Sequence, residues 1–272
     1  ITIFKQNIEY YNYIFYIIYM ISKLINSKEC YSRPKWFLRQ AGRHIPDYYL
    51  IRNKHQDFVD FCFEENSIVE ATILPLKYYN IDAAILFSDI LIIPHCLGQK
   101  VTFKKNIGPL LQNIEINQDF LKRDINFNDL IPIKNAIMKI KRLIPATKDL
   151  IGFCGAPWTL ACYMLEGKSS KDFIKTRRFL WNDEKTFMKL INKLTNSCAE
   201  FLEYQYLAGA SVLMIFDSWA NMIPDRYNAK FGIDPIRSIV NKLRNKGIKC
   251  PIIGLPFKSG EMIIQYSYES LV

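Results

Sequence analysis

Short apolar runs recur along this chain, and each has a length typical of a β-strand. They contain few charged residues, as expected of parallel strands buried on both faces. The pattern predicts five strands: Trp36–Leu38, Asp82–Phe87, Leu150–Phe153, Ser211–Phe216 and Pro251–Leu255.

The segments between these runs carry apolar residues at helical spacing instead. The clearest helix is predicted to begin at Asp183 and to end near Gly209. Asn66 is expected to cap an earlier helix, Pro132 opens another, and a last one covers Pro235–Asn245. Strands and helices therefore alternate along the chain.

This alternation predicts a parallel β/α architecture, either a barrel or an open doubly wound sheet. A hairpin is expected near Gly98–Phe103, and the polar stretch 119–129 is expected to be a surface loop. No linker-like stretch divides the chain, so we predict one main domain. Both architectures place functional groups at the carboxyl ends of strands, so candidate site residues are expected there.

Composition and charge exclude several classes of protein. The 272 residues are 50% hydrophobic, enough for a sizeable core, and the net charge is +10. The lysines are scattered, and most aromatic residues fall on apolar faces, so we expect neither a nucleic-acid partner nor a membrane surface. Seven dispersed cysteines without a Cys-x-x-Cys pair indicate reduced thiols, and three histidines without ligand spacing predict no metal site.

An arginine pair follows the first predicted strand. Arg39 and Arg43 flank Gln40, Ala41 and Gly42, and the two small residues would let a ligand approach the backbone. Each guanidinium can bind a carboxylate or phosphate through two parallel hydrogen bonds. The segment is therefore a candidate anion site, although an isolated pair of this kind would also fit a solvated loop.

Other polar groups stand at the ends of the later strands. Asp89 follows Asp82–Phe87, and Asp217-Ser218 follows Ser211–Phe216. Asp89 alone would equally suit a helix cap. The chain has neither a Gly-x-Gly-x-x-Gly nor a Gly-Lys-Ser/Thr turn, which disfavours dinucleotide and ATP sites. Arginines facing a carboxylate favour a polyanionic organic ligand that also has a cationic or N–H centre.

Four collinear blocks resemble the uroporphyrinogen decarboxylase family. They are RQAGRHIPDY, DAAILFSDIL, LIGFCGAPWTLACYMLEGKSSKDF and the segment from Ser211 through Trp219 and Ala220. The similarity covers about Arg33 to Gly260, and the FDSWA form of the last block is more like bacterial and plastid members.

The resemblance implies a (β/α)8 TIM barrel that works as a homodimer with neither metal nor organic cofactor. The implied activity is that of a carboxy-lyase of haem biosynthesis. It removes four acetate carboxyl groups from uroporphyrinogen III and yields coproporphyrinogen III and CO2. A protonated pyrrole ring serves as the electron sink, which explains why no cofactor is needed.

The resemblance also implies roles for individual residues. Asp89 and Arg39 are the expected catalytic residues; Asp89 would accept pyrrole N–H bonds and stabilise the cationic intermediate. The site arginines are poor candidates for the proton donor, because arginine is a poor acid at neutral pH. The proton donor therefore stays unassigned. The expected substrate-binding residues are Arg39, Gln40, Ala41, Gly42, Arg43, Arg52, Asp89, Tyr163 and Ser218.

Some of these positions also have a structural interpretation. Tyr163 would otherwise be a core residue, Ser218 a turn residue and Arg52 a solvated helix charge. Two positions depart from the family pattern, since Tyr49 replaces an arginine and His44 a tyrosine.

Residues 1–32 are expected to be an extension, either a targeting remnant or a packing helix, and 33–272 a partial barrel domain with about five of the eight strands. An inactive fragment, or a barrel-sharing corrinoid or thiol methyltransferase relative, is the alternative. A plastid of apicoplast or chloroplast type is the expected compartment, with the cytoplasm as the alternative, and no membrane contact is expected of the mature domain.

Overall fold

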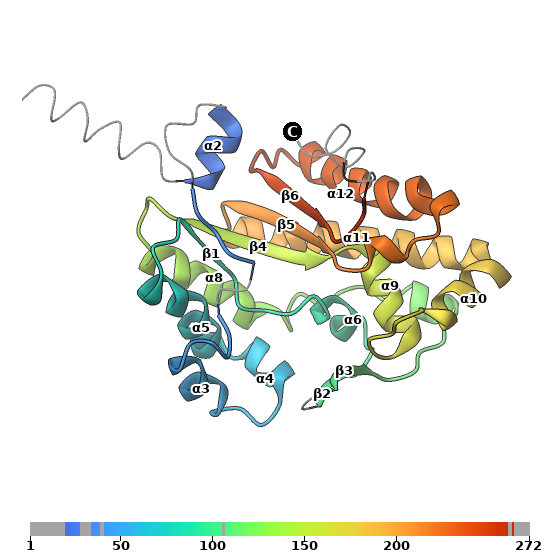
Figure 1. Cartoon of the computed structure of the whole chain (residues 1–272), viewed down its shortest axis with the longest axis horizontal. Coiled ribbons are helices and arrows are strands. Elements are labelled where there is room, and N and C mark those ends of the chain that lie inside the picture. The colour runs from blue at the N-terminus through green and yellow to red at the C-terminus, as the bar shows by residue number, and fades with distance from the viewer. Residues whose placement is uncertain (1–19, 28–33, 39–40, 105–106, 261–262, 264–272) are drawn as a thin grey trace, which may run out of the picture.

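A parallel sheet forms the centre of the computed structural model, which describes residues 20–27, 34–38, 41–104, 107–260 and 263 (Figure 1). Within these residues the sheet has four strands, in the order β1-β4-β5-β6. All neighbouring pairs are parallel, as the near-continuous apolar runs predict. The strands are β1 (Ala83–Ile85), β4 (Asp149–Gly155), β5 (Val212–Asp217) and β6 (Ile252–Pro256).

The prediction of a strand at Trp36–Leu38 was wrong. The chain meets the sheet just before this segment, at Lys35. Asp82, which precedes β1, donates its N–H to Lys35 O at 2.8 Å, and Lys35 N–H donates to the Asp82 carboxylate at 2.6 Å. Phe37 and Leu38 then turn outward and are 59% and 49% exposed. With Phe37 and Leu38 exposed, this run lacks the burial of a core strand, and the other four predicted strands form the sheet.

Helices connect the strands and cover the sheet (Figure 1). None of those among the described residues is long and apolar enough to cross a membrane. The longer ones are α5 (Glu65–Tyr78), α8 (Ile131–Leu143), α9 (Pro157–Glu166), α10 (Ile174–Asn182), α11 (Glu184–Ala208) and α12 (Asp234–Asn245). The shorter ones are α2 (Ile21–Ser27), α3 (Asp47–Arg52), α4 (Phe58–Phe63), α6 (Ile92–Cys96), α7 (Gln118–Leu121), η1 (Ala220–Met222), η2 (Asp225–Tyr227) and η3 (Asn228–Ile233).

The predicted boundaries of the long helix α11 are confirmed. The Asp183 side chain accepts a hydrogen bond from Thr186 N–H at the first turn, and Gly209 ends the helix with a φ of 125°. Such a backbone conformation favours glycine, so the chain can leave the helix there. Pro132 lies in the first turn of α8, as predicted.

Two local predictions were wrong. Glu64, not Asn66, caps α5, because its longer side chain reaches the N–H groups of Asn66 and Ser67 at 3.0 and 2.7 Å. The stretch 119–129 was expected to be only a surface loop, yet it overlaps α7, and Phe120 from that helix is buried in the core. Ile125 is buried in the same core, so two apolar side chains anchor this polar segment.

An antiparallel hairpin follows α6, as predicted. It pairs β2 (Val101–Lys104) with β3 (Gly108–Leu111). The hairpin lies on the same side of the sheet as α3 and α4 (Figure 1). Of these elements, α3 and α4 border the candidate site, which Tyr48 and Phe58 line.

The opposite end of the sheet is closed by hydrogen bonds to Asp149. This fully buried carboxylate accepts from the N–H and the hydroxyl of Ser22 in α2, both at 2.8 Å. It also accepts from the Ser211 hydroxyl at 2.7 Å. A buried carboxylate is tolerated when several donors surround it, so Asp149 ties α2 to the sheet.

Candidate functional site

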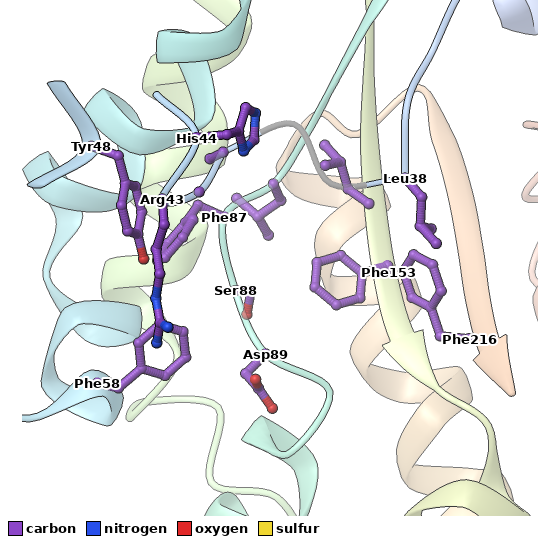
Figure 2. Close-up of a pocket in the computed structure, with 14 residues that line it drawn as sticks. Leu38, Arg43, His44, Tyr48, Phe58, Phe87, Ser88, Asp89, Phe153 and Phe216 are labelled. Atoms are coloured by element: carbon purple, nitrogen blue, oxygen red, sulfur yellow. The ribbon is translucent and has the colours of Figure 1, made fainter. Parts of the chain in front are cut away.

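A cleft of about 600 Å³ opens at the carboxyl ends of the strands, between the loop that leads into α3 and the segment after β1 (Figure 2). Ala41, Gly42, Arg43 and Asp89, all expected from the sequence, line it. The remaining lining residues are Leu38, His44, Tyr48, Phe58, Ile85, Leu86, Phe87, Ser88, Phe153 and Phe216.

The loop that carries Arg43 is anchored by apolar residues on either side of one turn. Ile45 N–H donates to Gly42 O at 3.0 Å, and the Ile45 and Tyr48 side chains are buried in a small cluster with Phe61. The Arg43 side chain itself is exposed and extends toward the ring of Phe58 (Figure 2). Arg39 and Gln40 lie outside the described residues.

Asp89 stands on the segment between β1 and α6. Its Oδ1 accepts a hydrogen bond from Leu91 N–H at 2.8 Å, so the carboxylate also supports the start of the following helix. Burial raises the pKa of Asp89 from its ordinary 3.8 to about 6, and the bond from Leu91 offsets part of this rise. At neutral pH the group is still largely ionised, as a residue that stabilises a cation must be.

This pKa predicts a pH-dependent cost to stability. Because the folded protein holds the proton more tightly than the unfolded chain, the Asp89 contribution to the free energy of unfolding falls as pH rises from about 4 to about 6. Above that range the carboxylate costs about 3 kcal/mol relative to its protonated form. We therefore expect Asp89→Asn to be the more stable protein at pH 7.5, and the two proteins to converge near pH 4, as measured by urea denaturation. If the free energies of unfolding of the wild type and Asp89→Asn differed by the same amount at pH 4 and at pH 7.5, this expectation would be contradicted.

The segment before Asp89 is held by a helix side chain. Phe87 N–H donates to the Thr72 hydroxyl of α5 at 2.9 Å, and that hydroxyl donates to Ile68 O at 2.7 Å. Thr72 is 1% exposed, so both bonds are shielded from water. This arrangement fixes the backbone two residues before the carboxylate.

Replacing Thr72 with valine is expected to lower the free energy of unfolding by about 1 to 3 kcal/mol, because Phe87 N–H would lose its acceptor. Urea denaturation measures the loss. Thr195→Val is a matched control: the buried Thr195 hydroxyl also donates to a carbonyl four residues earlier, Ile191 O, at 2.8 Å. Since no strand-end N–H among the described residues bonds to Thr195, equal losses in the two variants would refute the role of Thr72.

Three further residues expected at the site are not among those that line the cleft. Arg52 is turned toward its own loop, where its Nη1 donates to His55 O at 2.6 Å. Tyr163 is half-buried on α9, with its ring 5.9 Å from that of Trp219. Burial is the main cause of the raised pKa of Tyr163, and the negative charge of Asp89 adds to it.

Ser218 lies in the turn directly after β5. This turn is held by Thr159 of α9, whose hydroxyl donates to Asp217 Oδ1 at 2.6 Å and accepts from Trp219 N–H at 3.1 Å. The Asp217 carboxylate is buried at the end of the strand. Asp217 therefore orients the turn that carries Ser218.

Several lining residues were missed from the sequence. Phe153 and Phe216 end apolar runs and were assigned only to strands, yet their side chains line the cleft opposite Asp89 (Figure 2). Strand alternation could have placed them on the inner face of the sheet. The Ser88 hydroxyl is buried and finds no hydrogen-bond partner within the described residues. Nothing in the sequence distinguishes Ser88 from an ordinary strand-end serine.

The cleft combines a cation, a carboxylate and aromatic walls. The Arg43 guanidinium suits an anionic group at the edge of a ligand, and Asp89 suits an N–H or cationic centre further in. Within the described ranges, no three His, Cys, Asp or Glu side chains are grouped as a metal ion would require. The arrangement fits a flat, polyanionic organic molecule with N–H groups.

A parallel sheet with its cleft at the strand ends is the organisation of β/α-barrel enzymes. Among solved structures, a methyltransferase from Methanosarcina mazei is similar, with a TM-score of 0.61 and 11% sequence identity. The match covers 78% of this chain and 62% of that one. At this identity the likeness shows a common fold.

The chain belongs to the uroporphyrinogen decarboxylase family. The family model for uroporphyrinogen decarboxylase (URO-D) matches residues 20–269. The chain is 42% identical over 224 residues to uroporphyrinogen decarboxylase of Rickettsia felis, and 41% identical over 228 residues to that of Rickettsia massiliae. These matches cover 82% and 84% of this chain, and they span 65% and 66% of the two relatives.

Proposed function

We propose that this chain carries the decarboxylase activity of its family, converting uroporphyrinogen III to coproporphyrinogen III with release of four CO2. The observation that carries the proposal is the placement of Arg43 and Asp89 in one cleft walled by aromatic side chains. Both residues stand at positions where the sequence resembles the family motifs. The substrate offers carboxylates at its edge and pyrrole N–H groups at its centre.

Each decarboxylation then follows from the chemistry of the pyrrole ring. Protonation of a ring α-carbon creates a cation, which draws the bonding electrons of the acetate carboxyl group as CO2 leaves. A second proton on the exocyclic carbon completes the methyl group while the ring returns its first proton. Overall, one proton replaces one CO2, so no oxidant or reductant is consumed.

The described residues have distinct tasks in this scheme. Arg43, together with Arg39 beyond the described residues, binds substrate carboxylates. Asp89 accepts the pyrrole N–H bonds and stabilises the cation, because its carboxylate lies in a poorly solvated place. Phe153 and Phe216 exclude water from the reacting ring.

The proposal extends to assembly and compartment. The protein works as a homodimer, as the family resemblance implies. A plastid is its compartment. Three features support this: the heavy use of isoleucine, lysine, asparagine, tyrosine and phenylalanine that an A/T-rich coding genome gives, the FDSWA block that resembles bacterial and plastid members, and the uncharged aromatic and aliphatic run from Tyr10 to Ser22. Sedimentation of the purified protein tests the first point. Imaging of a fluorescent fusion in the source organism tests the second, with a cytoplasmic signal as the contrary result.

An anaerobic assay with uroporphyrinogen III tests the activity. The expected result is four CO2 per substrate and a product with four methyl groups in place of the acetates. The absence of CO2 release from folded protein would overturn the proposal. The chain would then be an inactive relative that retains the motifs.

A further inference from the structure

Strand β4 extends further than its neighbour β1. Asp149, Ile151, Phe153 and Gly155 direct their backbone groups toward the β1 side, because alternate residues of a parallel strand face the same neighbour. The ladder between the two strands runs from Ala83 to Leu86, whose N–H donates to Ile151 O at 2.9 Å. Beyond that bond the chain after β1 leaves β4.

A side chain from helix α11 takes the place of β1 at the next position. Gln205 is fully buried; its Oε1 accepts from Phe153 N–H and its Nε2 donates to Phe153 O, both at 2.8 Å. About two helical turns earlier on α11, the Cys198 thiol donates to Gly155 O at 3.2 Å. The part of the β4 edge that β1 leaves unpaired is thus hydrogen-bonded to side chains of helix α11.

Gly152 leaves room for this amide. A Cβ at Gly152 would lie 2.8 Å from Gln205 Oε1, closer than real Cβ contacts, and 3.1 Å from Gln205 Cβ, closer than most of them. The absence of a side chain at Gly152 therefore lets the Gln205 amide reach the backbone of Phe153. Its backbone conformation alone does not require a glycine, since its φ lies outside the left-handed region.

The departure of β1 from β4 creates the gap in which the cleft lies. Figure 2 shows Phe87, Ser88 and Asp89 on one side and Phe153 and Phe216 on the other. If the Gln205 amide were absent, Phe153 N–H and C=O would be buried without partners, and pairing with the segment after β1 would satisfy them. Such pairing would draw Asp89 toward β4 and narrow the cleft.

We propose that Gln205 is a positioning residue: its amide replaces β1 in the ladder and so holds Asp89 away from β4, across the cleft from Phe153. The residue does not touch the cleft itself. Its effect on turnover rests on the proposed function, whereas its effect on the position of Ser88 and Asp89 does not.

The test compares Gln205→Leu with Thr195→Val, a buried hydrogen-bond deletion on the same helix. In Gln205→Leu, the backbone amide resonances of Ser88 and Asp89 are expected to shift in ¹⁵N-labelled protein, and kcat is expected to fall by at least about tenfold. KM should change by less than about threefold, because Arg43 is anchored separately through Ile45. Thr195→Val should leave the resonances and kcat near their wild-type values.

Unchanged Ser88 and Asp89 resonances together with unchanged kcat in Gln205→Leu would overturn the proposal. Should that variant fail to fold, Gly152→Ala provides the second test, since its added methyl group displaces the amide without removing it. It is expected to shift the same two resonances, and an unshifted Asp89 would again refute the role. If wild-type protein releases no CO2, the proposed function fails, while the resonance comparison still decides the role of Gln205.

Discussion

Asp89→Asn is expected to lower turnover by about a thousandfold while the protein stays folded. At an effective dielectric constant near 20, a carboxylate about 4 Å from a positive charge stabilises it by roughly 4 kcal/mol. If the cation exists only along the reaction path, that energy corresponds to about three orders of magnitude in rate. Asparagine keeps an oxygen for the Leu91 N–H bond but lacks the charge.

The measurement is kcat for CO2 release, with substrate binding followed separately. Asp119→Asn, a change of the same charge at an exposed position on α7, serves as the control and is expected to keep full activity. Wild-type turnover in Asp89→Asn would remove this residue from the mechanism. If Asp89→Asn were more stable than the wild type at pH 7.5 and yet lost turnover, the Asp89 carboxylate would be shown to destabilise the fold while it supports the reaction.

Arg43→Met is expected to raise KM by about 10- to 100-fold, with a smaller effect on kcat. A charge-assisted hydrogen bond to a carboxylate contributes about 1.5 to 3 kcal/mol, and the exposed guanidinium makes no salt bridge with the described residues that its loss would break. Arg43→Lys should retain part of the affinity, because lysine keeps the charge but cannot form two parallel hydrogen bonds.

Arg142→Met is the matched control for this change. Arg142 is exposed on α8, and its replacement alters the net charge by the same amount. Steady-state kinetics at constant ionic strength separates the local contact from the general field of the protein. An equal rise of KM in both variants would mean that Arg43 acts only through net charge.

Much of the fold could be predicted from the pattern of apolar residues. Strands β4 and β5 were found because they are near-continuous apolar runs buried along their length, and helix α11 because its apolar residues recur at helical spacing. Asp183 and Gly209 mark the helix ends through a local hydrogen bond and a backbone conformation. The assignment of Trp36–Leu38 failed because a strand also needs a neighbour, and the hydrogen bonds to the chain before β1 lie at Lys35, outside the apolar run.

The candidate site was predictable only in part. Asp89 stands at the end of a predicted strand that the sheet contains, so the parallel topology accounts for its place. Arg43 follows a predicted strand that does not form, and its loop is held at the cleft by the packing of Ile45 and Tyr48. Tyr163 and Ser218 lie in neighbouring elements, and whether a side chain enters the cleft depends on packing that no spacing rule describes. Nothing in the sequence indicated that Gln205 is buried against a strand, because a polar residue on a helix is usually exposed.

Apolar runs, helical periodicity and contiguous motifs were enough to establish the order of strands and helices, the strand ends that carry polar groups, and the family to which the chain belongs. Two other features could not be inferred from them. Gln205 takes the place of β1 beside Phe153, 52 residues away, and burial raises the pKa of Asp89 to about 6. Both depend on distances between distant segments and on the exclusion of water, which exist only once the sheet and its helices have packed together.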